Sequence, residues 1–360
     1  MSPFFSVGVT TYDRLALLKE TIASIRAQNF TDFEVLIGND LVTRTLTPEA
    51  LDLVGDDRFR IINHPKNLGE WGNMNRLLEL AQGKYFTWLA DDDLYAPFFL
   101  ANAHRAISEG ARVVYGNFQA WHGGPAPALA TKGVGEYRRI PAARFAADAL
   151  AYRVPAIGSM GVYEIDLLRE LGGYVDVSEH PAGRGLFGEY MLFLKAATAV
   201  DEVVYFEKPQ AWFRDHATSF SFANQHVELR RQAGTNLVRK AVPALRHPRV
   251  QPLASDIMHS LMKIALGSVA DVSLRDPAFF EAKLPLALRA LRLDRVARAA
   301  GLPDSLSQSI GRTWKRAWLE TLASHAWPVS SRLVKRIVPA PVLKTWRAIR
   351  KNLVSPKSSG

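Results

Sequence analysis

Cysteine is absent from the 360-residue chain, which excludes disulfide bonds, thiolate nucleophiles and cysteine-based metal sites. Long apolar runs are also lacking, since no segment approaches the ~18 consecutive apolar residues that a membrane-spanning helix needs. The amino terminus, MSPFFSVGVTTYDR, has no basic region ahead of its apolar run and therefore lacks the pattern of a signal peptide. We expect a cytosolic protein.

Acidic residues are scarce in the second part of the chain. Residues 1–225 hold 21 Lys/Arg against 27 Asp/Glu, whereas residues 226–360 hold 24 against 8, so the net charge changes from −6 to +16. A break of this kind is typical of a change of domain or of partner. We predict a first domain over 1–225, a basic helical region over 226–354 and a disordered tail over 355–360.

The first domain alternates apolar runs with segments of helical periodicity. Continuously apolar runs are typical of strands buried on both faces, and they occur at 4–9, 33–38, 58–62, 85–90 and 112–116. Helical spacing occurs between them at 15–28, 47–54, 70–83 and 97–108, with Thr47 as a candidate N-cap. The alternation predicts an α/β fold with a mostly parallel sheet and helices on both faces.

Three consecutive aspartates follow one of these predicted strands. The segment YFTWLADDD places Asp91, Asp92 and Asp93 directly after the apolar run, and Asp40 follows the strand at 33–38. Ligands of parallel α/β sheets bind beyond the carboxyl ends of the strands. The aspartates therefore form either a solvated acidic turn or a site for a cation, since adjacent carboxylates repel one another as water is excluded.

Six motifs occur in an ordered series along residues 4 to about 220: FSVGVTTYDR, SIRAQNFTDFEVLIGND, NLGEWGNMNRLLELAQGKYFTWLADDDLYAP, LRELGGY, GEYMLFLKAA and WFRDHATSFS. This series resembles a family 2 glycosyltransferase, including the spore-coat polysaccharide type within that family. The resemblance implies a GT-A (Rossmann-like) catalytic domain over 1–225. It also implies inverting transfer of a sugar from a nucleotide-diphosphate donor to a hydroxyl acceptor.

The resemblance implies a divalent cation, Mn²⁺ or Mg²⁺, at the aspartate run. Asp92 occupies the position of the metal ligand, and His216 could reach the same cation. Asp91 is expected to contact ribose or metal, whereas Asp93 is interpreted as a cap for the helix that begins near 97. Ala90 stands where many relatives carry a further aspartate, which removes one expected ribose contact.

The same resemblance places the nucleotide. Thr10 and Tyr12 match contacts to the base and ribose, Asn39 and Asp40 follow the second strand, and Arg214 is expected to help neutralise the phosphates. Relatives commonly carry Asp-Asp at the positions of Asn39 and Asp40. The amide of Asn39 can both accept and donate hydrogen bonds, whereas an aspartate carboxylate only accepts them. Uridine is favoured, and dTDP- or GDP-sugars remain alternatives. The other interpretation of Asn39 and Asp40 is a turn.

The resemblance also implies a catalytic base. Glu189 in GEYMLFLKAA falls on the carboxylate that deprotonates the acceptor, where relatives more often carry aspartate. Its alternative role is that of an ordinary first-turn glutamate, which the helix dipole favours. The departures at Asn39, Ala90 and Glu189 also leave open a catalytically silent binding or scaffolding subunit.

The predicted carboxyl-terminal helix over 341–353 is basic and amphipathic. It places Trp346, Ile349 and Leu353 on one face and basic side chains on another, a pattern typical of helices that lie on anionic membrane surfaces. Packing on neighbouring helices is the alternative. No motif indicates nucleic-acid binding. We expect a surface-glycan or lipid-linked acceptor and peripheral attachment at the inner face of the cell membrane.

Overall fold

The computed structural model describes residues 2–122, 126, 128, 135–180, 185–215, 227–273 and 291–326. The chain divides into two compact units. One unit comprises Met1–Asn224 and Pro243–Leu253, and the other comprises Gln225–Val242 and Ala254–Gly360.

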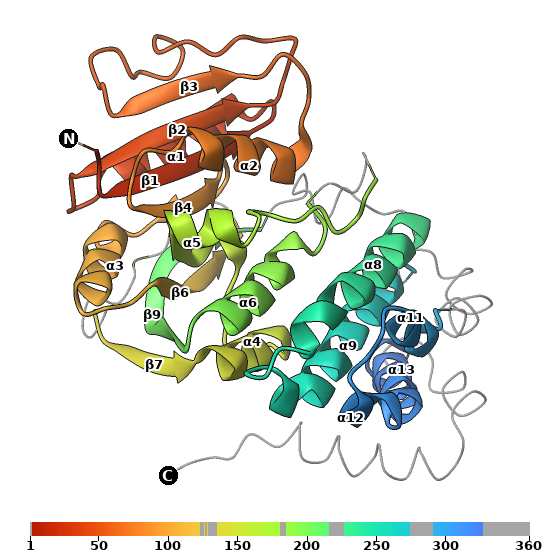
Figure 1. The fold of residues 1–360 in the computed structure, drawn as a ribbon. Coiled ribbons are helices and arrows are strands. Elements are labelled where there is room, and N and C mark those ends of the chain that lie inside the picture. The colour runs from red at the N-terminus through yellow and green to blue at the C-terminus, as the bar shows by residue number, and fades with distance from the viewer. Residues whose placement is uncertain are drawn as a thin grey trace, which may run out of the picture. The chain divides into compact units, whose positions relative to one another are not determined.

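A nine-stranded sheet forms the centre of the first unit, and its order is β3-β2-β1-β4-β8-β6-β9-β5, with β7 also paired to β9 (Figure 1). The strands are β1 (Phe5–Thr11), β2 (Phe33–Asn39), β3 (Phe59–Asn63), β4 (Tyr85–Ala90), β5 (Leu94–Tyr95), β6 (Val113–Trp121), β7 (Tyr137–Pro141), β8 (Gly161–Glu164) and β9 (Glu202–Arg214). The predicted α/β class, with a flanked sheet followed by a helical region, is confirmed.

The central strands align their carboxyl ends. Strand β1 pairs in parallel with both β2 and β4. In this register Thr11 lies opposite Asn39, and Thr10 lies opposite Ala90. The residues that follow β1, β2 and β4 therefore emerge at one edge of the sheet, where ligands bind in folds of this class.

The sheet is more mixed than the sequence pattern predicts. The short strand β8 lies between β4 and β6 and runs antiparallel to both. Strands β5 and β7 are also antiparallel to their partner β9. The five predicted strands all exist, but the pattern of apolar runs did not identify β8, which has only four residues.

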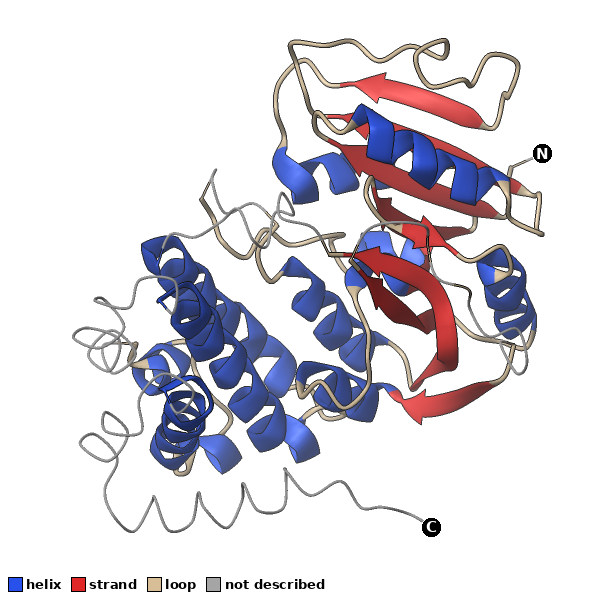
Figure 2. Ribbon diagram, turned by 180° about the vertical axis from the view of Figure 1, so that it is seen from behind, coloured by secondary structure: helices blue, strands red, loops and turns tan. Residues whose placement is uncertain are grey.

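The first unit carries helices on both sides of its sheet. Helices α1 (Leu15–Arg26) and α2 (Gly69–Leu80) lie on opposite faces (Figures 1 and 2). Their buried sides follow helical spacing, as in Leu18, Ile22 and Ile25 of α1. The other helices of this unit are α3 (Phe99–Ser108), α4 (Ala142–Leu150), the 3₁₀ turn η1 (Gly158–Met160), α5 (Ile165–Glu170) and α6 (Gly188–Ala199).

The helix predicted over 47–54 is wrong, because this segment forms turns. Thr47 does act as a cap, since its Oγ1 accepts a hydrogen bond from the N–H of Ala50 at 3.3 Å. Asp52 then has a φ of 56° and Gly55 a φ of 83°, so the backbone leaves the helical region after one turn. Buried Leu51 and Leu53 anchor the segment instead.

The described part of residues 227–326 contains only helices. They are α8 (Val227–Leu245), the 3₁₀ turn η3 (Gln251–Leu253), α9 (Ala254–Ser273), α11 (Leu293–Ala299), α12 (Asp304–Ser307) and α13 (Ile310–Ala326). Glu320 of α13 pairs with His259 and Lys263 of α9 at 3.1 and 3.2 Å. No helix in the described ranges is long and apolar enough to cross a membrane. The predicted helix at 341–353 and the tail at 355–360 lie outside those ranges.

Candidate active site

Asp91 joins the ends of β1 and β4. Its side chain is fully buried, and its Oδ2 accepts hydrogen bonds from Thr11 Oγ1 at 2.6 Å and from the backbone N–H of Tyr12 at 3.4 Å. Burial raises the pKa of Asp91 to about 6, although the Arg14 guanidinium opposes this shift. Asp91 is thus held rigidly by the strand that carries the predicted nucleotide contacts.

Arg14 bridges the two aspartates that the sequence singles out. Its Nη2 lies 2.6 Å from Asp91 Oδ1, and its Nη1 lies 2.5 Å from Asp92 Oδ2. The pattern of the sequence did not identify this residue as part of the site. It precedes α1 at the carboxyl end of β1, so the aligned ends of β1 and β4 were the available signal.

Asp93 faces a different arginine. Its Oδ1 accepts the backbone N–H of Arg214 at 2.9 Å, while the Arg214 Nε donates to the carbonyl oxygen of Asp92 at 2.9 Å. The interpretation of Asp93 as a helix cap is wrong, because α3 begins after Phe98, without a side-chain capping bond. Asp93 is buried, and this burial raises its pKa well above the ordinary value.

Arg214 supports the aspartate run from β9. Its guanidinium pairs with Glu20 of α1 at 2.5 Å and lies 3.9 Å from the centre of the Trp121 ring. Its side chain is only 10% exposed. These contacts make Arg214 a fixed support beneath Asp92 and Asp93.

Glu70 is a second residue that the sequence pattern did not identify. It occupies the first turn of α2, and its carboxylate interacts electrostatically with Arg14, Asp92 and Glu189. Burial and the neighbouring carboxylates of Glu189 and Asp92 raise the pKa of Glu70 to about 8. The site therefore combines several carboxylates that repel one another.

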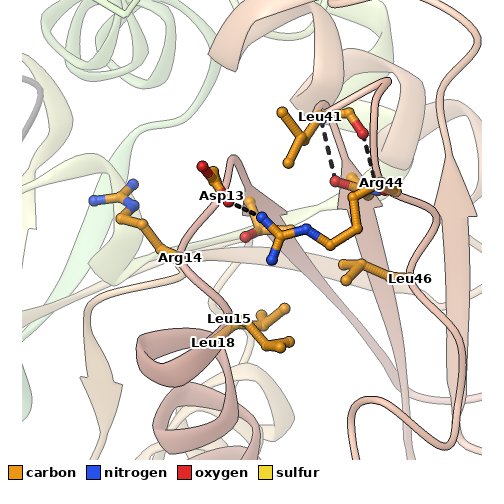
Figure 3. A pocket seen from close by; sticks show the side chains of 9 residues that line it. Asp13, Arg14, Leu15, Leu18, Leu41, Arg44 and Leu46 are labelled. Carbon is orange, nitrogen blue, oxygen red and sulfur yellow. Dashed lines mark hydrogen bonds and ion pairs between the residues drawn. The ribbon is translucent and has the colours of Figure 1, made fainter.

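A narrow pocket lies between the ends of β1 and β2 (Figure 3). Asp13 and Arg44 form an ion pair across it, and Tyr12 beside it is 53% exposed. Thr10 is buried and accepts a hydrogen bond from Trp88 Nε1 at 3.3 Å. The full lining is Thr11, Asp13, Arg14, Leu15, Leu18, Asn39, Leu41, Arg44 and Leu46.

Asn39 and Asp40 organise the loop that follows β2. The Asn39 Nδ2 donates to the carbonyl oxygen of Arg44 at 2.7 Å and to Asn63 Oδ1 at 2.8 Å, while its Oδ1 accepts the N–H of Leu41 at 3.1 Å. Asp40 Oδ1 accepts the N–H of Leu68, ahead of α2, at 2.7 Å. Both residues are buried, so they position the pocket wall.

Glu189 lies in the first turn of α6 and is half-buried. Its Oε2 accepts the backbone N–H of Gly158 at 3.1 Å. Burial raises the pKa of Glu189, and the Gly158 hydrogen bond opposes the shift. A carboxylate with a raised pKa and a free oxygen lone pair is suited to accept a proton.

The structure brings together Thr10, Tyr12, Asp91 and Asp92 at one edge of the sheet, with Arg214 beneath them. His216 lies outside the described residues. Within the described ranges, no group of three or more His, Asp or Glu side chains is arranged to hold a metal ion.

This mixed sheet, with its acidic run after β4, is the GT-A form of the nucleotide-binding α/β fold. A search of solved structures supports this fold: TarS 1–349 of S. aureus, in complex with UDP-GlcNAc, aligns with a TM-score of 0.51 at 15% identity, over 86% of this chain and 92% of that one. The family model described as glycosyl transferase family 2 matches residues 6–160. This part of the chain belongs to glycosyl transferase family 2.

Curated relatives match shorter stretches of the chain. The GalNAc(5)-diNAcBac-PP-undecaprenol beta-1,3-glucosyltransferase of Campylobacter jejuni is 33% identical over 117 residues, covering 32% of this chain and 38% of the relative. An uncharacterised glycosyltransferase of Rickettsia bellii is 29% identical over 120 residues, covering 32% of this chain and 17% of the relative. The chain thus spans well under half the length of these relatives.

Proposed function

We propose that the protein is an inverting glycosyltransferase that moves a sugar from a nucleotide-diphosphate donor, preferably a UDP-sugar, to a hydroxyl group of a surface-glycan or lipid-linked acceptor. One observation carries the proposal. In a domain of family 2, Asp91 and Asp92 contact residues at the end of β1, at the edge of the sheet. A separate half-buried carboxylate, that of Glu189, lies in the first turn of α6.

The donor nucleoside is assigned to the end of β1 and the pocket beside it. The exposed ring of Tyr12 offers a stacking surface, and Thr10 and Asp91 lie on the same edge. Asn39 Oδ1 accepts one hydrogen bond from Leu41 and keeps a second lone pair that suits the N3–H of uracil. Asp40 fixes the loop that carries this amide.

A divalent cation fits the charge of the aspartate site. The carboxylates of Asp91 and Asp92 both act on the single guanidinium of Arg14, so negative charge exceeds positive charge in this group even while the neighbouring Glu70 is protonated. We assign Asp92 and His216 as ligands, and Asp91 as a contact to ribose or metal. When bound, Mn²⁺ or Mg²⁺ neutralises charge on the departing diphosphate.

Arg214 contributes to the donor site through position. Its backbone N–H and its Nε hold Asp93 Oδ1 and the carbonyl oxygen of Asp92, so the Asp93 carboxylate and the backbone of Asp92 keep a fixed position. Its positive charge also lies beneath the region assigned to the diphosphate. In this conformation Glu20 and Trp121 engage the guanidinium.

Glu189 is the proposed base. Its carboxylate takes the proton from the acceptor hydroxyl while that oxygen forms a bond to the anomeric carbon of the donor sugar. The bond between the anomeric carbon and the diphosphate oxygen breaks, and its electron pair leaves with the nucleoside diphosphate. Attack opposite the leaving group inverts the configuration. The Gly158 N–H fixes one carboxylate oxygen during this step.

The acceptor and location follow from chemistry and charge. The Campylobacter jejuni relative is named for an undecaprenol-linked substrate, which favours a lipid-linked or glycan acceptor here. The surplus of basic residues over 226–360 suits an anionic membrane surface. We propose a catalytic domain over 1–225 and a basic helical region over 226–354 that keeps the enzyme at the cytoplasmic membrane face.

One screen tests the proposal. The full chain is heated with UDP, dTDP or GDP, each with and without Mn²⁺, and hydrolysis of the matching nucleotide sugars is then measured. Ligands that bind only the native state raise the melting temperature, so UDP with Mn²⁺ should stabilise most. Stronger stabilisation by GDP would overturn the uridine assignment. Absence of hydrolysis with every nucleotide sugar would indicate a silent binding subunit instead.

A further inference from the structure

The guanidinium of Arg14 holds the position of a cation between Asp91 and Asp92. It makes one close ion pair with each carboxylate, at 2.6 and 2.5 Å. Figure 3 shows the Arg14 side chain extending away from the Asp13–Arg44 pair that crosses the neighbouring pocket. Both arginines line the pocket, but Arg44 forms an ion pair across it, whereas Arg14 forms its ion pairs with the two aspartates.

The partners of this ion pair differ in their freedom to move. The Asp91 side chain is 0% exposed and the Asp92 side chain 11% exposed, whereas Arg14 is 27% exposed. Thr11 and Tyr12 also hold Asp91 through its second oxygen. Of the three side chains, Arg14 is the one that can leave without breaking the ends of β1 and β4 apart.

Arg214 provides a contrast within the same site. Its side chain is 10% exposed and is fixed by Glu20 and the Trp121 ring. The two arginines beside the aspartate run therefore have different roles. Arg214 is a permanent support, and Arg14 is a removable counter-ion.

A divalent cation on Asp92 would compete with Arg14. Both would be bound to the same carboxylate, and two positive groups at such short range repel each other strongly in a site that excludes water. A nucleoside diphosphate offers the guanidinium a new partner, because phosphate oxygens match its fork of donors. The donor can thus draw Arg14 away from the aspartates as the cation arrives.

We propose that Arg14 is a positioning residue that occupies the Asp91–Asp92 pair in the free protein and transfers to the donor diphosphate when the divalent cation binds. This inference rests on the proposed function. It predicts that the cation binds weakly alone and more tightly with nucleotide. By linkage, the cation must strengthen nucleotide binding by the same factor.

The test measures Mn²⁺ binding to the full chain by electron paramagnetic resonance, with and without UDP. In Arg14→Met, Mn²⁺ alone should bind about tenfold more tightly than in the wild type, and UDP should add less. Arg26→Met removes the same charge from the last turn of α1, where Arg26 is 48% exposed and pairs with Asp56 at 3.6 Å, and it leaves the aspartate pair intact. It should behave like the wild type.

Three results would overturn the proposal: unchanged or weaker Mn²⁺ binding by Arg14→Met, an equal gain in Arg26→Met, or no Mn²⁺ binding to any of these proteins. If Arg14→Met does not fold, Arg14→Lys carries the test, because the ammonium group keeps the charge but lacks the planar fork of the guanidinium, so it should hold the two carboxylates less firmly and show an intermediate gain. These readouts do not depend on turnover. Failure of the glycosyltransferase proposal would appear separately, as absence of nucleotide-sugar hydrolysis by the wild type.

Discussion

The indole ring of Trp71 fills the space that a side chain at Gly188 would need. A Cβ built on Gly188 would lie 2.4 Å from Trp71 Cε2 and 2.7 Å from its Nε1. Trp71 is 3% exposed and stacks on Tyr174, with 5.7 Å between ring centres. Helix α2 is therefore fitted against the residue that immediately precedes Glu189.

Gly188→Ala should damage both stability and turnover. The buried Trp71 ring would have to shift, at a cost of about 1–3 kcal/mol for an overpacked core, and Glu189 would shift with it. Thermal melting and donor hydrolysis measure the two effects. Gly311→Ala is the matched control, because a Cβ at that helical position meets no atom within 4 Å. Equal behaviour of the two variants would contradict the packing argument.

Glu189→Gln should keep donor binding and lose roughly 10²–10⁴-fold in turnover, because the amide keeps the size of the side chain but cannot accept the proton. In the wild type, burial raises the pKa of Glu189 above its ordinary value of 4.5. Since the base works deprotonated, kcat/KM should rise as pH increases through that raised pKa. A pH–rate profile checks this, and a variant that retains full turnover would exclude Glu189 as the base.

Asp92→Asn should abolish the stabilisation that Mn²⁺ adds to UDP. The amide lacks the negative charge that the cation needs, whereas UDP alone should still bind through the end of β1. A ligand at about 100 times its Kd contributes about 2.7 kcal/mol, so the loss is measurable as a change in melting temperature. Asp52→Asn is a suitable control, since that side chain is 72% exposed and pairs with Lys19. Persistent Mn²⁺-dependent stabilisation would remove Asp92 from the metal site.

Glu70→Gln should stabilise the free protein at high pH. The pKa of Glu70 is about 8 in the folded state against an ordinary value of 4.5, so its contribution to stability is present below about pH 4.5 and is lost as pH rises through 8. The glutamine imitates the protonated acid at every pH. The melting temperature of the variant relative to the wild type should therefore increase over this range, by about 2–4 °C for each kcal/mol.

Glu79→Gln provides the control for this prediction. It lies on the same helix, but its side chain is 65% exposed beside Arg76. The melting temperature of the Glu79→Gln variant should follow that of the wild type across the pH range. A Glu70→Gln difference that stays constant with pH would show that electrostatic repulsion is not the cause.

The predicted helix at 341–353 should promote binding to anionic vesicles. Each basic residue near such a surface contributes about 1 kcal/mol, and Trp346, Ile349 and Leu353 supply apolar area. Sedimentation compares the full chain with a chain that ends at Ala340. Equal pelleting of both chains would exclude the helix as the anchor. If neither chain pelleted, the basic region would instead serve packing or self-association.

Sequence patterns predicted the central strands and the edge where their polar residues meet. Continuously apolar runs identify buried strands, and parallel pairing then determines which ends lie together, as for Thr10 and Ala90. The segment at 47–54 could not be predicted in this way. Its leucines have helical spacing, but Asp52 and Gly55 adopt left-handed backbone conformations that end the helix.

The partners of the acidic residues were harder to predict. Arg14 is adjacent to the predicted nucleotide contacts, yet only the three-dimensional register of β1 and β4 shows that it reaches Asp91 and Asp92. Glu70 is remote in sequence from Arg14 and from the two aspartates. Its role depends on how α2 approaches the sheet. Charge partners separated by such distances leave no periodic signal in the chain.

The place of β8 in the sheet bears on how the protein is made. The family-matched segment ends at residue 160, and β8 begins at Gly161, although it is the strand that joins β4 to β6. When a nascent chain has reached residue 160, β4 has an open edge and β6 lacks both of its partners, β8 and β9, and such unpaired strands are prone to aggregate. The four residues of β8 cover the edge of β4 and pair with β6, so an expressed fragment should include β8.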